Sequence, residues 1–131
     1  MAASAGTQAD IRENAAQARS TDTFGRVQCT ARNHYFIVDG PVQNGCPGEA
    51  VTPTELFVSA IAACGVELVE VIARQQGVPL QEVSASITSL QDRNNTARPD
   101  FSVFNSLRLH LHLKGVTQEQ GTQLVEAFKR R

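Results

Sequence analysis

The sequence has little excess charge of either sign, because 12 lysine and arginine residues are balanced by 13 aspartate and glutamate residues. A net charge of −1 provides no electrostatic attraction for nucleic acid or for an anionic membrane surface. We expect no secretory signal, since the N-terminus lacks a basic region followed by an apolar stretch, and no apolar run long enough to span a bilayer. With 131 residues, of which 41% are apolar and 19% charged, the chain fits one folded cytoplasmic domain.

Cysteine occurs only at Cys29, Cys46 and Cys64, and no two of these residues form a C-x-x-C pair. The odd count and the spacing exclude a disulfide framework and a cysteine-ligated zinc site. The sequence also lacks a glycine-rich phosphate-binding loop and a G-x-S-x-G nucleophile motif. We expect neither a metal nor a bound cofactor, so each thiol must be judged as a buried small side chain or as a reactive group.

His110 and His112 are the residues closest to a metal-binding pattern. They alternate along a predicted strand and therefore share one face, which is a workable geometry for two ligands. No third ligand follows at a recognisable spacing, and Arg108 and Lys114 belong to the same face. We interpret this face as solvated.

The first regular pattern in the chain is a strand pair. Residues 24–31 and 34–39 predict two strands with a turn at residues 32–33 between them. The following stretch, residues 40–51, is rich in glycine and proline and predicts a loop that carries Cys46.

The strongest element is a long helix that begins at Pro53 and stops at Gly77. Thr52 can cap this helix, Pro53 suits the first helical position, and Glu55 completes a capping box. Between residues 56 and 65 nearly every side chain is apolar or small, so the helix must be buried on almost every side. A domain of this size rarely surrounds a long helix by itself, which favours a homodimer with the helix near the interface.

Two more strands and a helix follow. Residues 83–88 and 103–114 alternate apolar and polar side chains, as half-buried strands do. Thr117 and Gln120 form a capping box for a second helix that ends near Lys129. The predicted fold is therefore α+β with the order β-β-α-β-β-α. We assign residues 23–131 to this domain and residues 1–22 to an N-terminal arm, either partly helical or disordered.

Cys64 lies in the middle of the long helix and allows two interpretations. It is either a small buried packing residue or a reactive thiolate at a dimer interface, which requires a nearby cation or helix dipole. Cys46 is either an incidental loop thiol or a disulfide partner for Cys64. Cys29 alternates with Val27 along a strand, and we expect it in the core.

The string TPTELFVSAIAACGVELVEVIARQQGV, which contains Cys64, resembles the central segment of the OsmC/Ohr family. In that family a P-x-E-L start precedes a small-residue helix bearing the peroxidatic cysteine. The preceding HYFIVDGP and the following strands and helix fit the same order, so the resemblance covers Phe24 to the C-terminus. It implies an intertwined homodimer with two long, buried central helices. It also implies that Cys64 reduces a hydroperoxide, that a second cysteine resolves the sulfenic acid as a disulfide, and that a thiol reductant restores the protein.

Two positions depart from the family pattern. The resolving cysteine of the family follows the last helix, where this sequence ends at Arg131. An acidic residue follows the motif proline in the peroxidases and pairs with a catalytic arginine, whereas this sequence has Thr54. Arg32 is nearest to the expected arginine and Arg26 is the alternative, and we assign the role to neither. The sequence is closer to the general OsmC-like branch than to the dedicated reductases.

Two functions follow from these observations. The first is an OsmC-like cysteine-dependent peroxidase, or hydroperoxide reductase, in oxidative stress defence, with Cys64 as the peroxidatic thiol. The second is a non-catalytic dimer of the same fold that binds a small hydrophobic or thiol-reactive ligand. A plain dimerisation module, in which Cys64 only packs, is a more distant third.

Overall fold

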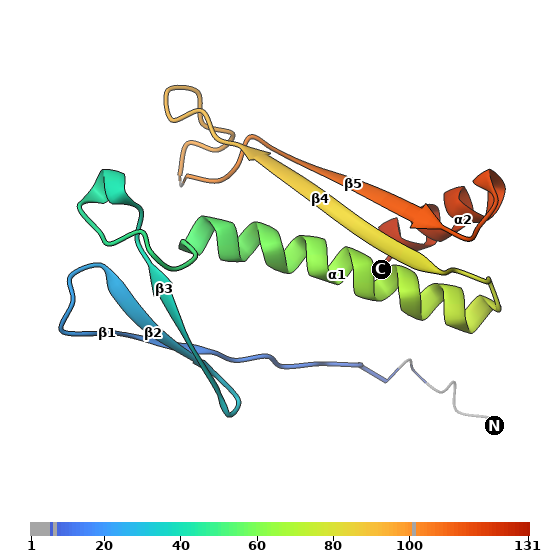
Figure 1. Cartoon of the computed structure of the whole chain (residues 1–131), viewed down its shortest axis with the longest axis horizontal. Helices are drawn as coiled ribbons and strands as arrows, with labels where there is room; N and C mark the ends of the chain where they lie inside the picture. Colours follow the sequence, from blue (N-terminus) through green and yellow to red (C-terminus); the bar gives the residue numbers. More distant parts are fainter. Residues whose placement is uncertain (1–5, 7, 101) are drawn as a thin grey trace. The chain divides into compact units, whose positions relative to one another are not determined.

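Two antiparallel sheets and two α-helices make up the part of the chain that the computed structural model describes, residues 6, 8–100 and 102–131 (Figure 1). The chain forms two units, residues 1–53 and residues 54–131. The predicted arm over residues 1–22 falls partly outside the described residues, at positions 1–5 and 7. Each unit contains one of the two sheets.

The first unit is a three-stranded sheet. Its strands are β1 (Gln17–Ser20), β2 (Arg26–Ala31) and β3 (His34–Asp39), in the order β1-β2-β3. The predicted turn joins β2 to β3, and Arg32 adopts a left-handed conformation there, with φ 54°. Directly paired residues share a face, so Cys29 and its partner Phe36 lie on one face. Cys29 is half-buried on that face and is not one of the buried core residues, so the expectation that it lies in the core is not met within the single chain.

Strand β1 is an element that the sequence pattern does not reveal. Its four residues, QARS, are all exposed and show no apolar alternation. The strand is formed by backbone pairing with β2, from Gln17 opposite Thr30 to Ser20 opposite Val27. The Arg19 side chain adds two hydrogen bonds to Gln28 Oε1, at 3.0 and 2.8 Å. A pattern of apolar side chains cannot predict a strand that is held by backbone pairing and polar contacts.

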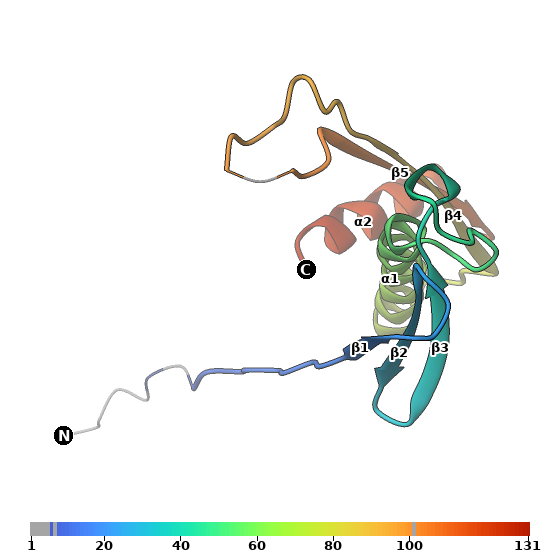
Figure 2. The ribbon, with the colours of Figure 1, turned by 90° about the vertical axis from the view of Figure 1, so that its left-hand side faces the viewer.

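The second unit is a two-stranded sheet with both helices on its apolar face. Its elements are α1 (Pro53–Gln76), β4 (Glu82–Leu90), β5 (Ser106–Lys114) and α2 (Gln118–Lys129), so the predicted order and long central helix are confirmed (Figures 1 and 2). The core combines residues of α1, β4 and α2, namely Val69, Ile72, Ala73, Val83 and Leu124. Thr117 and Gln120 form the predicted capping box at the start of α2.

The start of the last strand was predicted wrongly. Strand β5 begins at Ser106 rather than at residue 103, because the preceding residues belong to a structured loop. The Asn105 side chain accepts a hydrogen bond from the Asp92 amide at 2.7 Å and donates one to the Asn95 carbonyl at 2.8 Å. Phe104 stacks on Phe57 of α1, with ring centroids 5.6 Å apart. These contacts replace the ladder that the alternation predicted.

Helix α1 also corrects two expectations. By length and composition it is apolar enough to cross a membrane, with a mean hydropathy of 2.1, whereas no such run was expected. The core helix of a soluble protein meets the same test, so this is weak evidence for a membrane span. The helix was further expected to be buried on almost every side, but within the single chain only Gly65, Val69, Ile72 and Ala73 are buried.

Candidate functional site

Cys64 lies near the middle of α1, and its side chain is exposed in the single chain. The next residue, Gly65, is buried and faces β5 and α2, where an added Cβ would lie 3.2 Å from Leu109 Cδ2 and 3.6 Å from Phe128 Cζ. Successive helical residues point about 100° apart. The thiol of Cys64 therefore leaves the helix beside the packed face rather than within it.

The helix surface on the N-terminal side of Cys64 is apolar and carries no charge, whereas the exposed Glu67 lies one turn beyond it. Residues 56–65 contain no charged side chain, and the exposed members of this segment include Phe57, Ala60 and Ala63. Phe57 precedes Cys64 by seven residues, so both side chains project from nearly the same face, about 10 Å apart along the axis. Phe57 is 52% exposed although Phe104 stacks on it. This face is an uncovered apolar surface with a thiol in it.

The first unit contains a buried ion pair that the sequence analysis did not find. Asp39, at the end of β3, is fully buried. Its two carboxylate oxygens accept hydrogen bonds from Arg26 Nε at 2.8 Å and from the second guanidinium nitrogen of Arg26 at 3.0 Å. The backbone amides of Glu49 and Ala50 donate to the same carboxylate at 3.0 and 2.9 Å. This arrangement satisfies the buried charge completely, as burial of a carboxylate requires.

These contacts fix the ionisation of both partners. The guanidinium of Arg26, together with the two amides, holds the pKa of the Asp39 carboxyl far below its usual range. The Asp39 carboxylate raises the pKa of Arg26 in turn, chiefly through the hydrogen bonds between them. Glu49 adds a weaker contact, with its carboxylate 3.9 Å from Arg26. The pair is charged under all ordinary conditions.

The Arg26–Asp39 pair closes the loop that carries Cys46. The Asp39 amide donates to the Val51 carbonyl at 3.0 Å, so the two ends of the loop meet at this residue. Inside the loop, the Cys46 side chain packs against Gly25 and Gly40, where any added Cβ would collide with it. Cys46 is therefore a half-buried thiol that packs between two glycines. No sequence motif predicted this packing.

The remaining candidates are exposed side chains. Arg32 is exposed in the turn between β2 and β3. His110 and His112 are exposed on β5, as the solvated face predicts. Within residues 6, 8–100 and 102–131, no group of three or more histidine, cysteine, aspartate or glutamate side chains could hold a metal ion.

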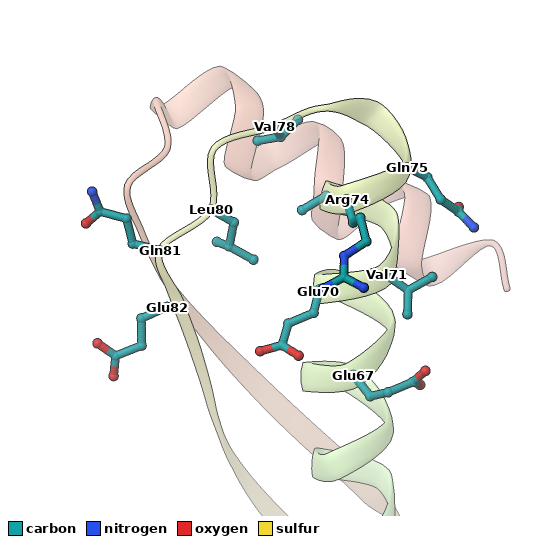
Figure 3. A pocket seen from close by; sticks show the side chains of 10 residues that line it. Glu67, Glu70, Val71, Arg74, Gln75, Val78, Leu80, Gln81 and Glu82 are labelled. Atoms are coloured by element: carbon teal, nitrogen blue, oxygen red, sulfur yellow. The ribbon is translucent and has the colours of Figure 1, made fainter.

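A groove of about 630 Å³ lies between the C-terminal half of α1 and the start of β4 (Figure 3). Figure 3 shows Glu67, Glu70 and Arg74 on the helix and Glu82 on the strand. Cys64 does not line this groove, and its walls contain no thiol or hydroxyl nucleophile. The groove offers no chemistry related to the thiol of α1.

Comparison with known protein families gives a match over the larger part of the chain. The family model described as OsmC-like protein matches residues 46–131. No curated protein matches the sequence.

Solved structures share the fold. An OsmC-like protein from Mycoplasma pneumoniae superposes with a TM-score of 0.78 at 12% identity, over 92% of this chain and 82% of that one. An organic hydroperoxide resistance protein from Legionella pneumophila has a TM-score of 0.68 at 25% identity, over 93% and 85%. The organic hydroperoxide resistance protein OhrB of Bacillus subtilis has a TM-score of 0.59 at 20% identity, over 91% and 84%.

Proposed function

Because the chain belongs to the family of OsmC-like proteins, we propose that it is a cytoplasmic, cysteine-dependent hydroperoxide reductase with Cys64 as the thiol that is oxidised. The observation that carries the proposal is the position of Cys64, exposed on an apolar face of the central helix. Two structural neighbours, from Legionella pneumophila and Bacillus subtilis, bear names that refer to organic hydroperoxide resistance.

The proposed reaction has three thiol-dependent steps. The Cys64 thiolate attacks the terminal oxygen of a hydroperoxide, the O–O bond breaks, and the organic group leaves as an alcohol after taking up a proton. Cys64 is then a sulfenic acid. A second thiol attacks the sulfenic sulfur and releases water, which leaves a disulfide, and a dithiol reductant returns both sulfurs to thiols.

The proposed assembly is a homodimer. The apolar face of α1 around Cys64 is uncovered in one chain, with Phe57 52% exposed and Ala60 and Ala63 also exposed. A contiguous apolar surface of this kind marks an interaction site. A second copy that covers it would also remove Cys64 from bulk water and leave an apolar environment for the organic part of a peroxide.

The charge distribution around Cys64 favours a second candidate function. Residues 56–65 supply no cation to stabilise a thiolate, and a thiolate requires such a group or a helix N-terminus. A non-catalytic dimer that holds a small hydrophobic ligand on this face needs neither. The two candidates therefore differ in whether Cys64 reacts.

The test is to trap the sulfenic acid with dimedone after exposure to cumene hydroperoxide or to hydrogen peroxide. Cys64→Ser is the decisive variant, while Cys29→Ser and Cys46→Ser are matched controls. Rapid labelling that disappears only in Cys64→Ser, with the organic peroxide preferred, supports the reductase. A folded dimer whose Cys64 stays unlabelled with both oxidants overturns it and leaves the ligand-binding function.

A further inference from the structure

The outer face of the β4–β5 pair lies opposite the core and is polar except at the end of β4, where Leu90 lies. Pairing places Ser84 opposite His112, Ser86 opposite His110, and Thr88 opposite Arg108. The core-facing side chains alternate with these and include Val83, Leu111 and Leu113. The outer face therefore carries hydroxyl groups on β4 and basic side chains on β5.

We define the basic stripe as the four basic residues on the outward side of β5, Arg108, His110, His112 and Lys114, all of which are exposed. Same-face residues of a strand recur about every 6.8 Å, so the basic stripe is about 20 Å long. Lys114 forms an ion pair with Glu82 at 3.3 Å. Among the residues that the structure describes, Arg108 has no ion-pair partner, so it presents a free guanidinium.

The fixed charges of this face are few. The charged groups that face His110 and His112 are Arg108 and Lys114 on their own strand and Glu82 across the sheet; the other facing side chains on β4 are hydroxyls. Since Lys114 pairs with Glu82, Arg108 is the fixed cation of the face beyond that ion pair.

An apolar side chain stands at one end of the same face. Leu90 pairs with Ser106, directly beyond the Thr88–Arg108 pair, and is 67% exposed. The face thus offers an apolar contact followed by a row of cations with hydrogen-bonding hydroxyls beside them. A ligand that matches it has one apolar group followed by carboxylates spaced about 7 Å apart, which is the same-side spacing of an extended peptide.

Two other classes of anionic partner fit less well. Single-stranded nucleic acid requires aromatic platforms for its bases, and neither strand has an aromatic residue on this face. An anionic bilayer is recognised by clusters of four to eight fixed cations, whereas this face has only Arg108 and the paired Lys114.

We propose that this face binds an extended acidic segment of a partner protein, with Leu90 contacting an apolar residue of the segment and the basic stripe contacting its carboxylates. The proposal concerns a surface separate from Cys64 and stands independently of the thiol chemistry.

The test uses the full chain and a fluorescent peptide of one phenylalanine followed by alternating threonine and glutamate, with a glutamine-for-glutamate peptide as control. We expect the glutamate peptide to bind about tenfold more tightly than the glutamine peptide in low salt, since several exposed charge pairs add small increments. His110→Gln combined with His112→Gln weakens binding of the glutamate peptide, and Arg108→Gln also weakens it. Arg93→Gln, which removes an exposed loop cation, leaves binding unchanged.

Three outcomes overturn the proposal. The first is no difference between the glutamate and glutamine peptides at pH 6. The second is peptide binding that the double histidine variant, shown to be folded by circular dichroism, leaves unaltered. The third is stronger binding to a single-stranded oligonucleotide or to phosphatidylserine vesicles than to the peptide, which assigns the face to another class of partner.

Discussion

The two halves of α1 are built for different surroundings. The C-terminal half holds all four buried residues of the helix, Gly65, Val69, Ile72 and Ala73, and its outer side carries charged residues such as Glu67 and Glu70. The N-terminal half, up to Cys64, has no buried residue, and beyond Glu55 it has no charge. The C-terminal half, which we call the finished half, is an amphipathic helix packed by its own chain. The N-terminal half, which we call the open half, is an apolar surface that its own chain leaves uncovered.

The largest expected effect comes from truncating the finished half. Ile72 is 1% exposed and belongs to the core with Leu124 and Val83. We expect Ile72→Ala to lower the free energy of unfolding by about 2–5 kcal/mol, because it removes buried methyl groups and leaves a cavity. Urea denaturation followed by circular dichroism measures this. Ile61→Ala, at a half-buried position of the other half, is the matched variant, and an equal loss in both would erase the contrast between the halves.

A charge placed in the open half should act on assembly instead of on the fold. Ala63 is exposed beside Cys64, and in the proposed homodimer Ala63→Glu buries an unpaired carboxylate at the interface. We expect the dimer dissociation constant to rise about 100-fold, measured by analytical ultracentrifugation over a range of concentrations. Gln76→Glu adds the same charge to an exposed position of the other half and should leave association unchanged. A monomeric wild-type chain would contradict the proposed dimer itself.

The first unit provides an independent comparison, because the Arg26–Asp39 ion pair, rather than apolar packing, stabilises it. Asp39 has a folded-state pKa held far below its usual range by Arg26. The pair therefore stabilises the fold fully above about pH 4, where the carboxyl ionises in the unfolded chain as well, and this contribution is lost as the pH falls toward the lowered pKa.

Replacing Asp39 should reveal this acid sensitivity. We expect Asp39→Asn to lower the melting temperature at pH 7 by roughly 5–10 °C, since it leaves the Arg26 charge uncompensated. The gap to the wild type should shrink between pH 4 and pH 2, because the unfolded wild-type chain takes up a proton at Asp39 there while the folded chain does not, so the pair contributes less to stability. Calorimetry over this pH range checks the prediction, with Asp92→Asn as an exposed control. A gap that stays constant with pH would mean that the ion pair contributes nothing through its charge.

The sequence predicted what depends on local periodicity. The helix from Pro53, the capping box at Thr117 and the turn at Arg32 are each specified by a few neighbouring residues, and the structure contains all three. The Arg26–Asp39 pair escaped prediction because its partners are 13 residues apart and meet only through the register of β2 and β3. From the sequence, polar residues at the two ends of a hairpin are expected to be solvated. Only the paired strands in the structure show that one of them, Asp39, is buried.

Cys64 illustrates a limit of a different kind. The apolar helix and the family resemblance pointed to this residue in the sequence. They did not predict that its side chain is exposed, because exposure depends on which side of the helix packs, and it is Gly65 that faces Leu109. Whether the thiol reacts depends on groups that the neighbouring ten residues do not supply. The role of Cys64 therefore stays a prediction that only the trapping experiment decides.

The smallest expected effect tests how far α2 supports the finished half of α1. Thr117 accepts a hydrogen bond from the Gln120 amide at 3.1 Å, and the Gln120 side chain accepts one from the Thr117 amide at 2.9 Å. We expect Thr117→Ala to cost about 1 kcal/mol, the usual value of an N-cap, because it leaves one amide of the first turn unsatisfied. Thr117→Ser keeps the hydroxyl and should restore most of the stability in urea denaturation.

Since Leu124 of α2 completes the core around Ile72, faster hydrogen exchange in Thr117→Ala should extend into the C-terminal half of α1. Faster exchange confined to the half before Cys64 would show that α2 does not support the half it packs against.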